Sequence, residues 1–181
     1  MRVTISSSSN ESISDLYKES AIKVCDYLAE NGWDLNWGSG SISIMGICYN
    51  EFSKYNRKIY GYTSSKYVDD IENLPNANHK IFDTTFDLKK NIFNDGDLVL
   101  LLPGGTGTIS EFFAYLEEVR SNDIDKTLVL YNEDHHFDST INLIDDLVKR
   151  SFNSDSIYNY FKVVNSFDEF KTLINEYNKK S

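Results

Sequence analysis

Cysteine and proline are scarce in this 181-residue chain, which has two of each. Two cysteines cannot build the dense disulfide framework of a small secreted domain. Cys25 and Cys48 lie in apolar surroundings without the spacing of metal ligands, so we expect reduced, buried thiols and no metal site. With two prolines and nine glycines there is no Pro-rich or Gly-rich linker, and we expect a single domain spanning residues 1–181.

The chain also lacks a long hydrophobic run and an excess of positive charge. No stretch is long and apolar enough to span a bilayer, and residues 1–9 lack the basic and apolar regions of a secretory signal. We therefore expect a cytoplasmic protein with no membrane partner. The formal net charge is −10, which repels the phosphate backbone of nucleic acids. We expect no nucleic-acid partner, and any nucleotide partner to be small and locally held.

The chain has enough apolar residues for a buried core, and predicted strands and helices alternate regularly along it. Hydrophobic residues make up 40% and aromatic residues 14%, which favours a folded domain over disorder. The predicted strands cover residues 2–6, 33–37, 58–62, 80–84, 98–102, 127–131 and 162–164. The predicted helices cover residues 12–32, 44–55, 86–93, 110–120, 139–150 and the segment from 167. This alternation predicts an α/β, Rossmann-like three-layer fold with a mostly parallel sheet and helices on both faces.

Two segments have a distinctive composition. Leu98–Leu102 is apolar without alternation, which is typical of a strand covered on both faces, so we expect it to be the central strand. Residues 63–78 are polar and contain Pro75, and we expect a surface loop with one short turn of helix.

The densest signal is the turn Pro103-Gly104-Gly105-Thr106-Gly107-Thr108, between the apolar strand and a helix that carries Glu111. Pro103 ends strand pairing because it has no N–H, and glycines let the backbone approach an anion and adopt positive φ. The free N–H groups at the start of the next helix then point at that anion, and the threonine hydroxyls add hydrogen bonds. Ligands of such sheets bind at the carboxyl ends of strands, so the turn predicts a phosphate site. The alternative is a tight turn whose glycines serve packing alone.

A second turn, Gly38-Ser39-Gly40-Ser41-Ile42-Ser43-Ile44-Met45-Gly46, also lies between a strand and a helix. Its N–H and hydroxyl groups supply further donors, and two turns from neighbouring strands can enclose one ligand. The turn departs from the dinucleotide fingerprint, and Tyr60-Gly61-Tyr62 stands where an acidic residue would bind the ribose of NAD. The pattern disfavours NAD, and we expect no cofactor.

These motifs resemble those of a known family. Pro103–Thr108 with Glu111 fits P-G-G-x-G-T-x-x-E, the hallmark of the LOG-like family of cytokinin riboside 5′-monophosphate phosphoribohydrolases, often labelled putative lysine decarboxylases. Gly38–Gly46 is similar to the companion motif G-G-G-x-x-G-L-M-G, with serine at two of the glycine positions. Asn132–Asp138 is similar to the family segment N-x-x-G-Y-Y-N. The resemblance extends over residues 3–152.

The resemblance implies a Rossmann-like fold, a homodimer, and hydrolysis of the N-glycosidic bond of a nucleoside monophosphate to a base and ribose 5-phosphate. Cleavage builds positive charge on the sugar, and the resemblance gives Glu111 the role of stabilising it. The family's Arg-Lys pair falls on Leu88 and Lys89, so Lys89 is the candidate cation and the arginine is absent. The phosphate- and nucleotide-binding set that it implies consists of Gly104, Gly105, Thr106, Gly107, Thr108, Gly38, Ser39, Gly40, Ser8 and Met45.

Several functions stay open at this point. The first is a nucleoside 5′-monophosphate phosphoribohydrolase, and the second is a non-catalytic nucleotide-binding or sensing protein, which the replacement of the arginine by Leu88 motivates. The acidic charge disfavours a DNA-handling protein on the same fold. His79-Lys80 superficially resembles the His-Lys pair of pyridoxal-dependent decarboxylases, yet the chain is too short for the usual domains of that chemistry. We interpret Asp134-His135-His136 as a solvated loop rather than a metal cluster.

Overall fold

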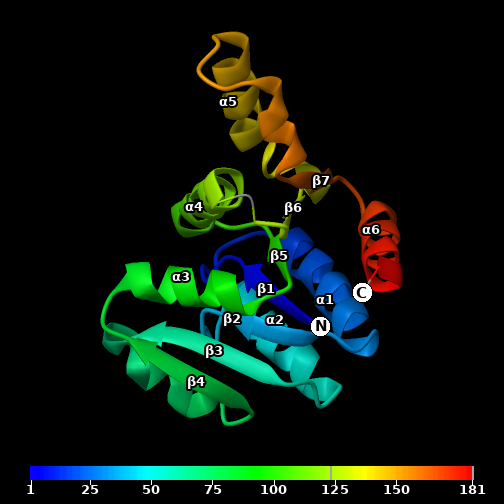
Figure 1. Ribbon diagram of the computed structural model, residues 1–181. Helices are drawn as coiled ribbons and strands as arrows, with labels where there is room; N and C mark the ends of the chain where they lie inside the picture. The colour runs from blue at the N-terminus through cyan, green and yellow to red at the C-terminus, as the bar shows by residue number, and fades with distance from the viewer. Residues whose placement is uncertain (123, 181) are drawn as a thin grey trace.

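The computed structural model describes residues 1–122 and 124–180, which form one sheet with helices on both faces (Figure 1). The strands are β1 (Arg2–Ser6), β2 (Asp34–Trp37), β3 (Ile59–Ser64), β4 (Ala77–Phe82), β5 (Leu98–Leu101), β6 (Thr127–Tyr131) and β7 (Lys162–Val164). The α-helices are α1 (Asp15–Glu30), α2 (Ser43–Lys54), α3 (Thr85–Asp95), α4 (Thr106–Asn122), α5 (Asp138–Lys149) and α6 (Phe167–Lys180). Three short 3-10 helices are η1 (Ser65–Asn73), η2 (Glu133–His135) and η3 (Asp155–Asn159).

The strands pair in parallel throughout, in the order β4-β3-β2-β1-β5-β6-β7. The predicted α/β fold with a parallel sheet is confirmed. The middle strand is β1, and β5 lies beside it, so the expectation that residues 98–102 form the central strand was wrong by one place. An apolar run cannot separate these two positions, because both have a strand on each side and helices on both faces. The direction of winding reverses beside β1, and open α/β sheets bind ligands at such a point.

Each face of the sheet has its own buried core. Leu98 and Leu100 of β5 pack under α1, α2 and α6, whereas Val99 and Leu101 pack under α3, α4 and α5. All four side chains are fully buried, which explains why this strand is apolar without alternation. The helices therefore cover both faces, as the sequence predicts.

The polar stretch after β3 contains more regular structure than expected. β3 continues to Ser64, η1 follows at once, and β4 begins at Ala77 rather than Lys80. Six residues of β4 pair with β3, yet three of them are exposed and none is fully buried, because β4 is an edge strand. The expected surface loop with one short turn of helix is found in part: residues 65–76 form η1 and a turn, but residues 63–64 belong to β3 and residues 77–78 to β4. The start of β4 was missed because exposed strand residues have the polar composition of a loop.

Helix starts follow local capping chemistry. The Ser14 hydroxyl accepts a hydrogen bond from the N–H of Leu16, so α1 begins at Asp15, after the predicted start near Ser12. The Thr84 hydroxyl caps α3 by accepting from the N–H of Asp87. Helix α4 begins at Thr106, four residues before its predicted start, so its first turn includes part of the glycine turn.

Further observations concern other parts of the fold. Helix α5 and the segment after it extend outward beyond β6 and β7 (Figure 1).

Cys25 and Cys48 are buried, unbridged thiols with their Sγ atoms 3.6 Å apart. Within residues 1–122 and 124–180, no group of three His, Cys, Asp or Glu side chains is placed to hold a metal ion. Over the same residues, no helix is long and apolar enough to cross a membrane.

Candidate functional site

A cavity of about 530 Å³ lies at the carboxyl ends of β1, β2 and β3, beside α3 and the start of α4. We call it the glycine-turn cavity. It is lined by Ser9, Gly38, Ser39, Gly40, Ser41, Ile42, Met45, Tyr62, Thr63, Ser64, Tyr67, Thr85, Leu88, Lys89, Gly107 and Glu111. Residues from both glycine turns meet here, which follows from the parallel sheet: the carboxyl ends of neighbouring strands share one edge.

The cavity brings together part of the predicted site. Glu111, Lys89, Gly107, Gly38, Ser39, Gly40 and Met45 line it. Gly104, Gly105, Thr106, Thr108 and Ser8 belong to the adjoining turns and are not among its lining residues. Leu88, at the position of the absent arginine, is half-buried in the wall.

The glycines of the first turn are required for different reasons. At Gly104 a Cβ would lie 2.1 Å from the Thr108 hydroxyl oxygen, so close packing excludes any side chain. At Gly105 and Gly107 a Cβ would meet no atom of the described residues within 4 Å, apart from the adjoining residues and the nearby backbone of α4. None of the three has the positive φ expected from the sequence. Neither packing nor backbone conformation therefore explains glycine at positions 105 and 107.

In the second turn serine adopts the conformation usually left to glycine. Ser39 and Ser43 have φ of 56° and 54°, in the left-handed region. The Ser39 hydroxyl lies 3.0 Å from Nδ1 of His79, and the Ser43 hydroxyl donates to the carbonyl of Asn10 at 2.7 Å. These side-chain bonds hold two residues in a conformation that costs about 1–2 kcal/mol for a residue other than glycine.

Ser8 joins the two turns behind the cavity. Its N–H donates to the carbonyl of Pro103, and its own carbonyl accepts from the N–H of Met45, both at 3.2 Å. Its hydroxyl accepts from the N–H of Asn10 at 3.0 Å, and the residue is buried. Ser9, the next residue, lines the cavity instead.

Glu111 is the carboxylate of the cavity. The Ser6 hydroxyl at the end of β1 donates a hydrogen bond to it. Burial raises the pKa of Glu111 above its ordinary value of 4.5, while the Ser6 hydrogen bond and the charge of Lys89 act in the opposite direction. Lys89 Nζ donates to the Ser110 hydroxyl at 2.6 Å, next to Glu111 in sequence. One carboxyl group and one ammonium group therefore face the same space.

Comparison with known proteins identifies the family. A family model described as "Possible lysine decarboxylase" matches residues 45–174. The chain belongs to this family. Among curated proteins it is similar to the probable cytokinin riboside 5′-monophosphate phosphoribohydrolase LOG4 of Oryza sativa subsp. japonica, 23% identical over 88% of this chain and 70% of that protein. It is also similar to LOG of the same plant, at 25% identity over 75% of this chain and 57% of that protein. LOG1 of Arabidopsis thaliana is 26% identical over 75% of this chain and 64% of that protein.

Solved structures share the fold at low identity. The molybdenum cofactor carrier protein of Chlamydomonas reinhardtii has a TM-score of 0.70 at 12% identity, over 97% of this chain and 96% of that one. The molybdenum cofactor binding protein of Rippkaea orientalis has a TM-score of 0.62 at 17% identity, over 97% and 94%. DNA processing protein A of Streptococcus pneumoniae has a TM-score of 0.61 at 12% identity, over 94% of this chain and 60% of that one.

A family glycine motif also shows how this member differs from the LOG-like pattern. In the segment similar to N-x-x-G-Y-Y-N, His135 occupies the glycine position and has a φ of 61°. Together with Ser39 and Ser43, three motif positions where the LOG-like pattern has glycine are left-handed here without glycine. Residues other than glycine therefore hold the left-handed conformation at these three positions, whereas Gly38, Gly40 and Gly46 retain the glycine of the pattern.

Although the family is described as a possible lysine decarboxylase, His79 and Lys80 do not form a paired site in this protein. His79 and Lys80 are consecutive on β4, and their side chains point to different partners. His79 contacts Ser39 and the carbonyl of Leu74, whereas Lys80 pairs with Asp95 at 2.6 Å. The two side chains do not converge on one space.

Sequence reasoning missed several residues of the site. Ser6 was assigned only to a strand, although it is the hydrogen-bond donor to Glu111. Tyr67 lines the cavity from η1, in the stretch that was expected to be a loop. His136 was interpreted as part of a solvated loop, but its ring nitrogen Nε2 lies 2.8 Å from the carbonyl oxygen of Gly104. That contact joins residues 32 apart in the chain, and no local pattern signals it.

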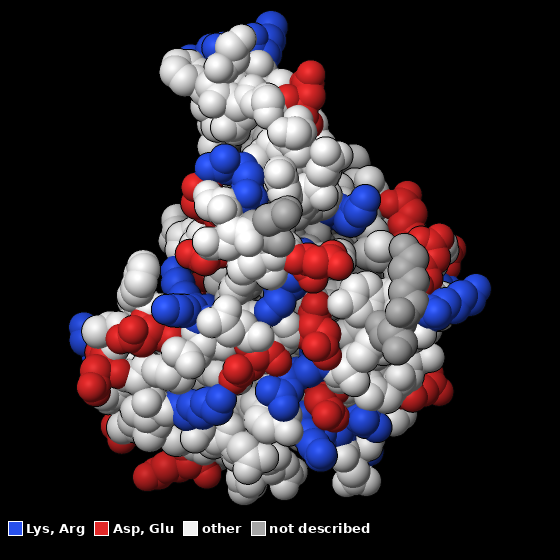
Figure 2. All heavy atoms as spheres, viewed as in Figure 1, with Lys and Arg blue, Asp and Glu red and all other residues white. Residues whose placement is uncertain are grey.

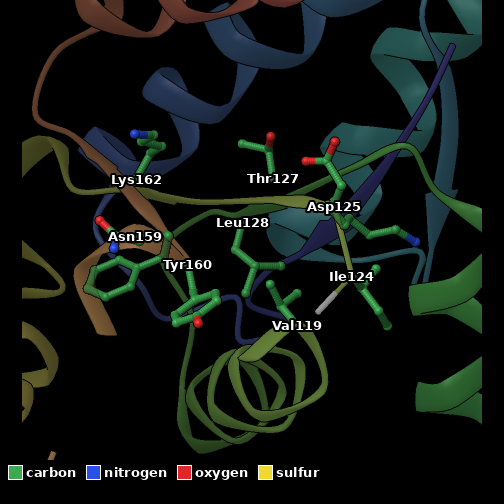
Figure 3. A pocket seen from close by; sticks show the side chains of 10 residues that line it. Val119, Ile124, Asp125, Thr127, Leu128, Asn159, Tyr160 and Lys162 are labelled. Atoms are coloured by element: carbon green, nitrogen blue, oxygen red, sulfur yellow. The ribbon is translucent and has the colours of Figure 1, made fainter. Parts of the chain in front are cut away.

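A second hollow lies at the opposite end of the strands. It has a volume of about 480 Å³ and is lined by Val119, Ile124, Asp125, Lys126, Thr127, Leu128, Asn159, Tyr160, Phe161 and Lys162. Thr127 and Lys162 are the first residues of β6 and β7, and Asn159 and Tyr160 lie across from Val119 and Ile124 (Figure 3). It contains none of the predicted site residues and lies at the amino ends of the strands, so the glycine-turn cavity is the candidate site.

Proposed function

We propose that this protein hydrolyses the N-glycosidic bond of a nucleoside 5′-monophosphate, giving the free base and ribose 5-phosphate. The observation that carries the proposal is the open space at Gly105 and Gly107: apart from the adjoining residues and the nearby backbone of α4, no atom of the described residues lies within 4 Å of a Cβ position. Because neither glycine is needed for φ or for packing, close approach by a ligand is the remaining reason for both. The similar proteins of Oryza sativa subsp. japonica, which are described as cytokinin riboside 5′-monophosphate phosphoribohydrolases, support this reaction.

The phosphate is assigned to the start of α4. The first N–H groups of a helix have no partner within the helix and carry the positive end of its dipole, so they favour an anion. Among the described residues, the N–H of Gly105 donates to no acceptor. Lys89, whose Nζ bonds to the Ser110 hydroxyl in this first part of α4, adds a positive charge.

The ribose is assigned to the space next to Glu111. As the bond from C1′ to the base nitrogen breaks, its electron pair leaves with the base and positive charge grows on the sugar ring. The carboxylate of Glu111 stabilises that charge and accepts a proton from the water that bonds to C1′. The departing base takes up one proton from solvent and Glu111 returns its proton to solvent, so one water is consumed and the carboxylate is restored. The Ser6 hydrogen bond holds the carboxylate in position.

A second candidate function is binding of a phosphate-bearing ligand without turnover. The observation that favours it is Leu88, which lines the cavity where the family motif has arginine. Leucine supplies neither the charge nor the planar pair of donors that arginine offers a phosphate. Two structural neighbours are named as a carrier and a binding protein of the molybdenum cofactor, so this fold does serve binding roles elsewhere.

Base release from nucleoside monophosphates separates the two candidates. The purified protein is incubated with AMP, GMP, CMP and UMP, and free base is measured by chromatography. The proposal expects release by the wild-type protein and, on removal of the carboxylate charge, a loss of about 100-fold or more in Glu111→Gln. Thermal stabilisation by a nucleotide without any release would support binding alone, and neither response would contradict both functions.

A further inference from the structure

His136 lies behind the first glycine turn, outside the cavity. Its ring packs edge-on against Tyr17 and Phe137, with centroid distances of 5.5 and 4.8 Å. Its Nε2 lies 2.8 Å from the carbonyl oxygen of Gly104 and 3.1 Å from the nitrogen of the same residue. One ring nitrogen cannot both accept from the Gly104 N–H and donate to the Gly104 carbonyl. The carbonyl oxygen is the nearer of the two atoms, and an unprotonated Nε2 would face its lone pairs, so we assign the proton to Nε2. In this tautomer Nε2 donates to the carbonyl, and the 3.1 Å approach of the Gly104 N–H is a contact without a hydrogen bond.

This contact fixes the direction of a neighbouring N–H group. In a trans peptide the C=O and the N–H point in opposite directions. The carbonyl of Gly104 faces His136, so the N–H of Gly105 points away from the ring. The preceding peptide follows the same rule: the nitrogen of Gly104 faces His136, and the carbonyl of Pro103 points away to accept from Ser8.

The Gly104–Gly105 peptide needs such a support. Both residues lack a Cβ, so the peptide between them has more freedom to rotate than any other in the turn. A rotation that exchanged its C=O and N–H would present a carbonyl oxygen, instead of a donor, to an anion at the start of α4. The His136 hydrogen bond opposes that rotation, and the packing of the ring between two aromatic side chains holds the donor in place.

We propose that His136 is a positioning residue that aims the Gly105 N–H at the phosphate of the bound nucleotide. This inference rests on the proposed function, because it requires an anion in front of Gly105. The donor comes from the loop after β6, where Asp134 and His135 adopt consecutive left-handed conformations, with φ of 60° and 61°. That double turn leads into His136 and Phe137, directly before α5.

The test compares a nucleotide with its nucleoside, because only the nucleotide has the phosphate. AMP and adenosine are titrated calorimetrically into the wild-type protein, His136→Phe and His136→Gln. Phenylalanine keeps a ring between Tyr17 and Phe137 but removes the donor, whereas glutamine retains an N–H donor. We expect His136→Phe to bind AMP about tenfold more weakly with adenosine binding unchanged, and His136→Gln to regain part of the loss.

The outcomes separate this inference from the proposed function. Wild-type protein that binds AMP together with unchanged AMP affinity in His136→Phe overturns the inference and leaves the function standing. Equal losses for AMP and adenosine assign His136 a purely structural role and also overturn it. If wild-type protein binds none of AMP, GMP, CMP and UMP, both fail; if it binds one of the other three instead, the same comparison is made with that nucleotide and its nucleoside. Should His136→Phe not fold, the same AMP-to-adenosine comparison is made on His136→Gln and His136→Ala, and a nucleotide affinity equal in these two variants overturns the inference.

Discussion

At the scale of single residues, Glu111 places a carboxyl group where burial opposes its charge. Burial, the largest cause, raises its pKa above the ordinary value of 4.5. A raised pKa in the folded state means that the folded protein binds this proton more tightly than the unfolded chain does. Stability from this group is therefore present below the ordinary pKa and is lost as the pH rises through the raised value.

The raised pKa of Glu111 gives a prediction for Glu111→Gln. The variant should unfold at a higher temperature than the wild-type protein at neutral pH, and the difference should vanish as the pH falls towards 4.5, because glutamine removes the buried charge. Thermal unfolding measured across this pH range checks it. Glu117→Gln on the same helix is the matched control: Glu117 is exposed and hydrogen-bonds Arg120, which lowers its pKa, so its replacement should not stabilise. Equal stability of Glu111→Gln and wild type at neutral pH would contradict a raised pKa of Glu111 in the folded protein.

Leu88 gives a second prediction at this scale. Leu88→Arg places a guanidinium in the wall of the cavity, so the affinity for AMP should rise roughly tenfold, the effect of one charge-assisted hydrogen bond. Calorimetric titration measures the change. Phe86→Arg adds the same charge on the same helix at a side chain that is 79% exposed and outside the cavity, and it should leave the affinity unchanged. A similar gain in AMP affinity in both variants would mean that the change in net charge, and not the position of the arginine in the cavity, causes the gain.

At the scale of elements, the turns that join strands to helices contain left-handed residues other than glycine. His135 has a φ of 61°, and its exposed ring lies 3.2 Å from the carboxylate of Asp138. Exposed pairs of this kind contribute little to stability. A left-handed conformation costs a residue with a side chain more than it costs glycine.

We therefore expect His135→Gly to stabilise the protein, by roughly 0.5–1 kcal/mol. In a chain of this length that raises the unfolding temperature by about 1–4 °C, which scanning calorimetry detects. Ser41→Gly is the control, because Ser41 is exposed but is not left-handed, and glycine there should destabilise slightly. A lower unfolding temperature for His135→Gly would show that its side chain contributes more than the backbone conformation costs.

The elements also show how far the sequence determines the structure. Periodicity predicted all of the strands and the helices on both faces, because each buried element needs its own apolar pattern. It missed residues 77–79 at the start of β4, where an edge strand has the composition of a loop, and the place of β5, which depends on the order of strands. The motif located Gly107, Lys89 and Glu111 in one cavity. The contacts of Ser6 with Glu111 and of His136 with Gly104 join distant parts of the chain and were not predictable from local pattern.

At the scale of the whole molecule, the net charge of −10 opposes nucleic acid although one structural neighbour is a DNA processing protein. Lys and Arg side chains lie among Asp and Glu on the face shown in Figure 2, without a continuous basic stripe. We expect no binding to a fluorescent single-stranded oligonucleotide in an anisotropy titration at low salt, where electrostatic attraction is strongest. Binding that weakens steeply with added salt would contradict this expectation.

The homodimer implied by the family resemblance is a separate proposal at this scale. Light scattering coupled to size-exclusion chromatography measures the mass directly, and a mass of twice 20.8 kDa would support it. A mass of 20.8 kDa at the concentrations used for assays would mean that one chain supplies the whole site.

The central claim is that the open space at Gly107 receives a phosphate, and Gly107→Ala tests it most directly. Gly107 lies in the first turn of α4, and apart from the adjoining residues and the nearby backbone of α4 a Cβ there meets no atom of the described residues within 4 Å. Alanine should therefore stabilise the fold by about 0.5–1 kcal/mol. The same methyl group would occupy the space proposed for the ligand. Thermal unfolding and AMP titration on one sample should therefore move in opposite directions: a higher unfolding temperature and an affinity for AMP at least about tenfold weaker. Unchanged AMP affinity in a stabilised variant would contradict the account, because the glycine would then have no role in holding a ligand.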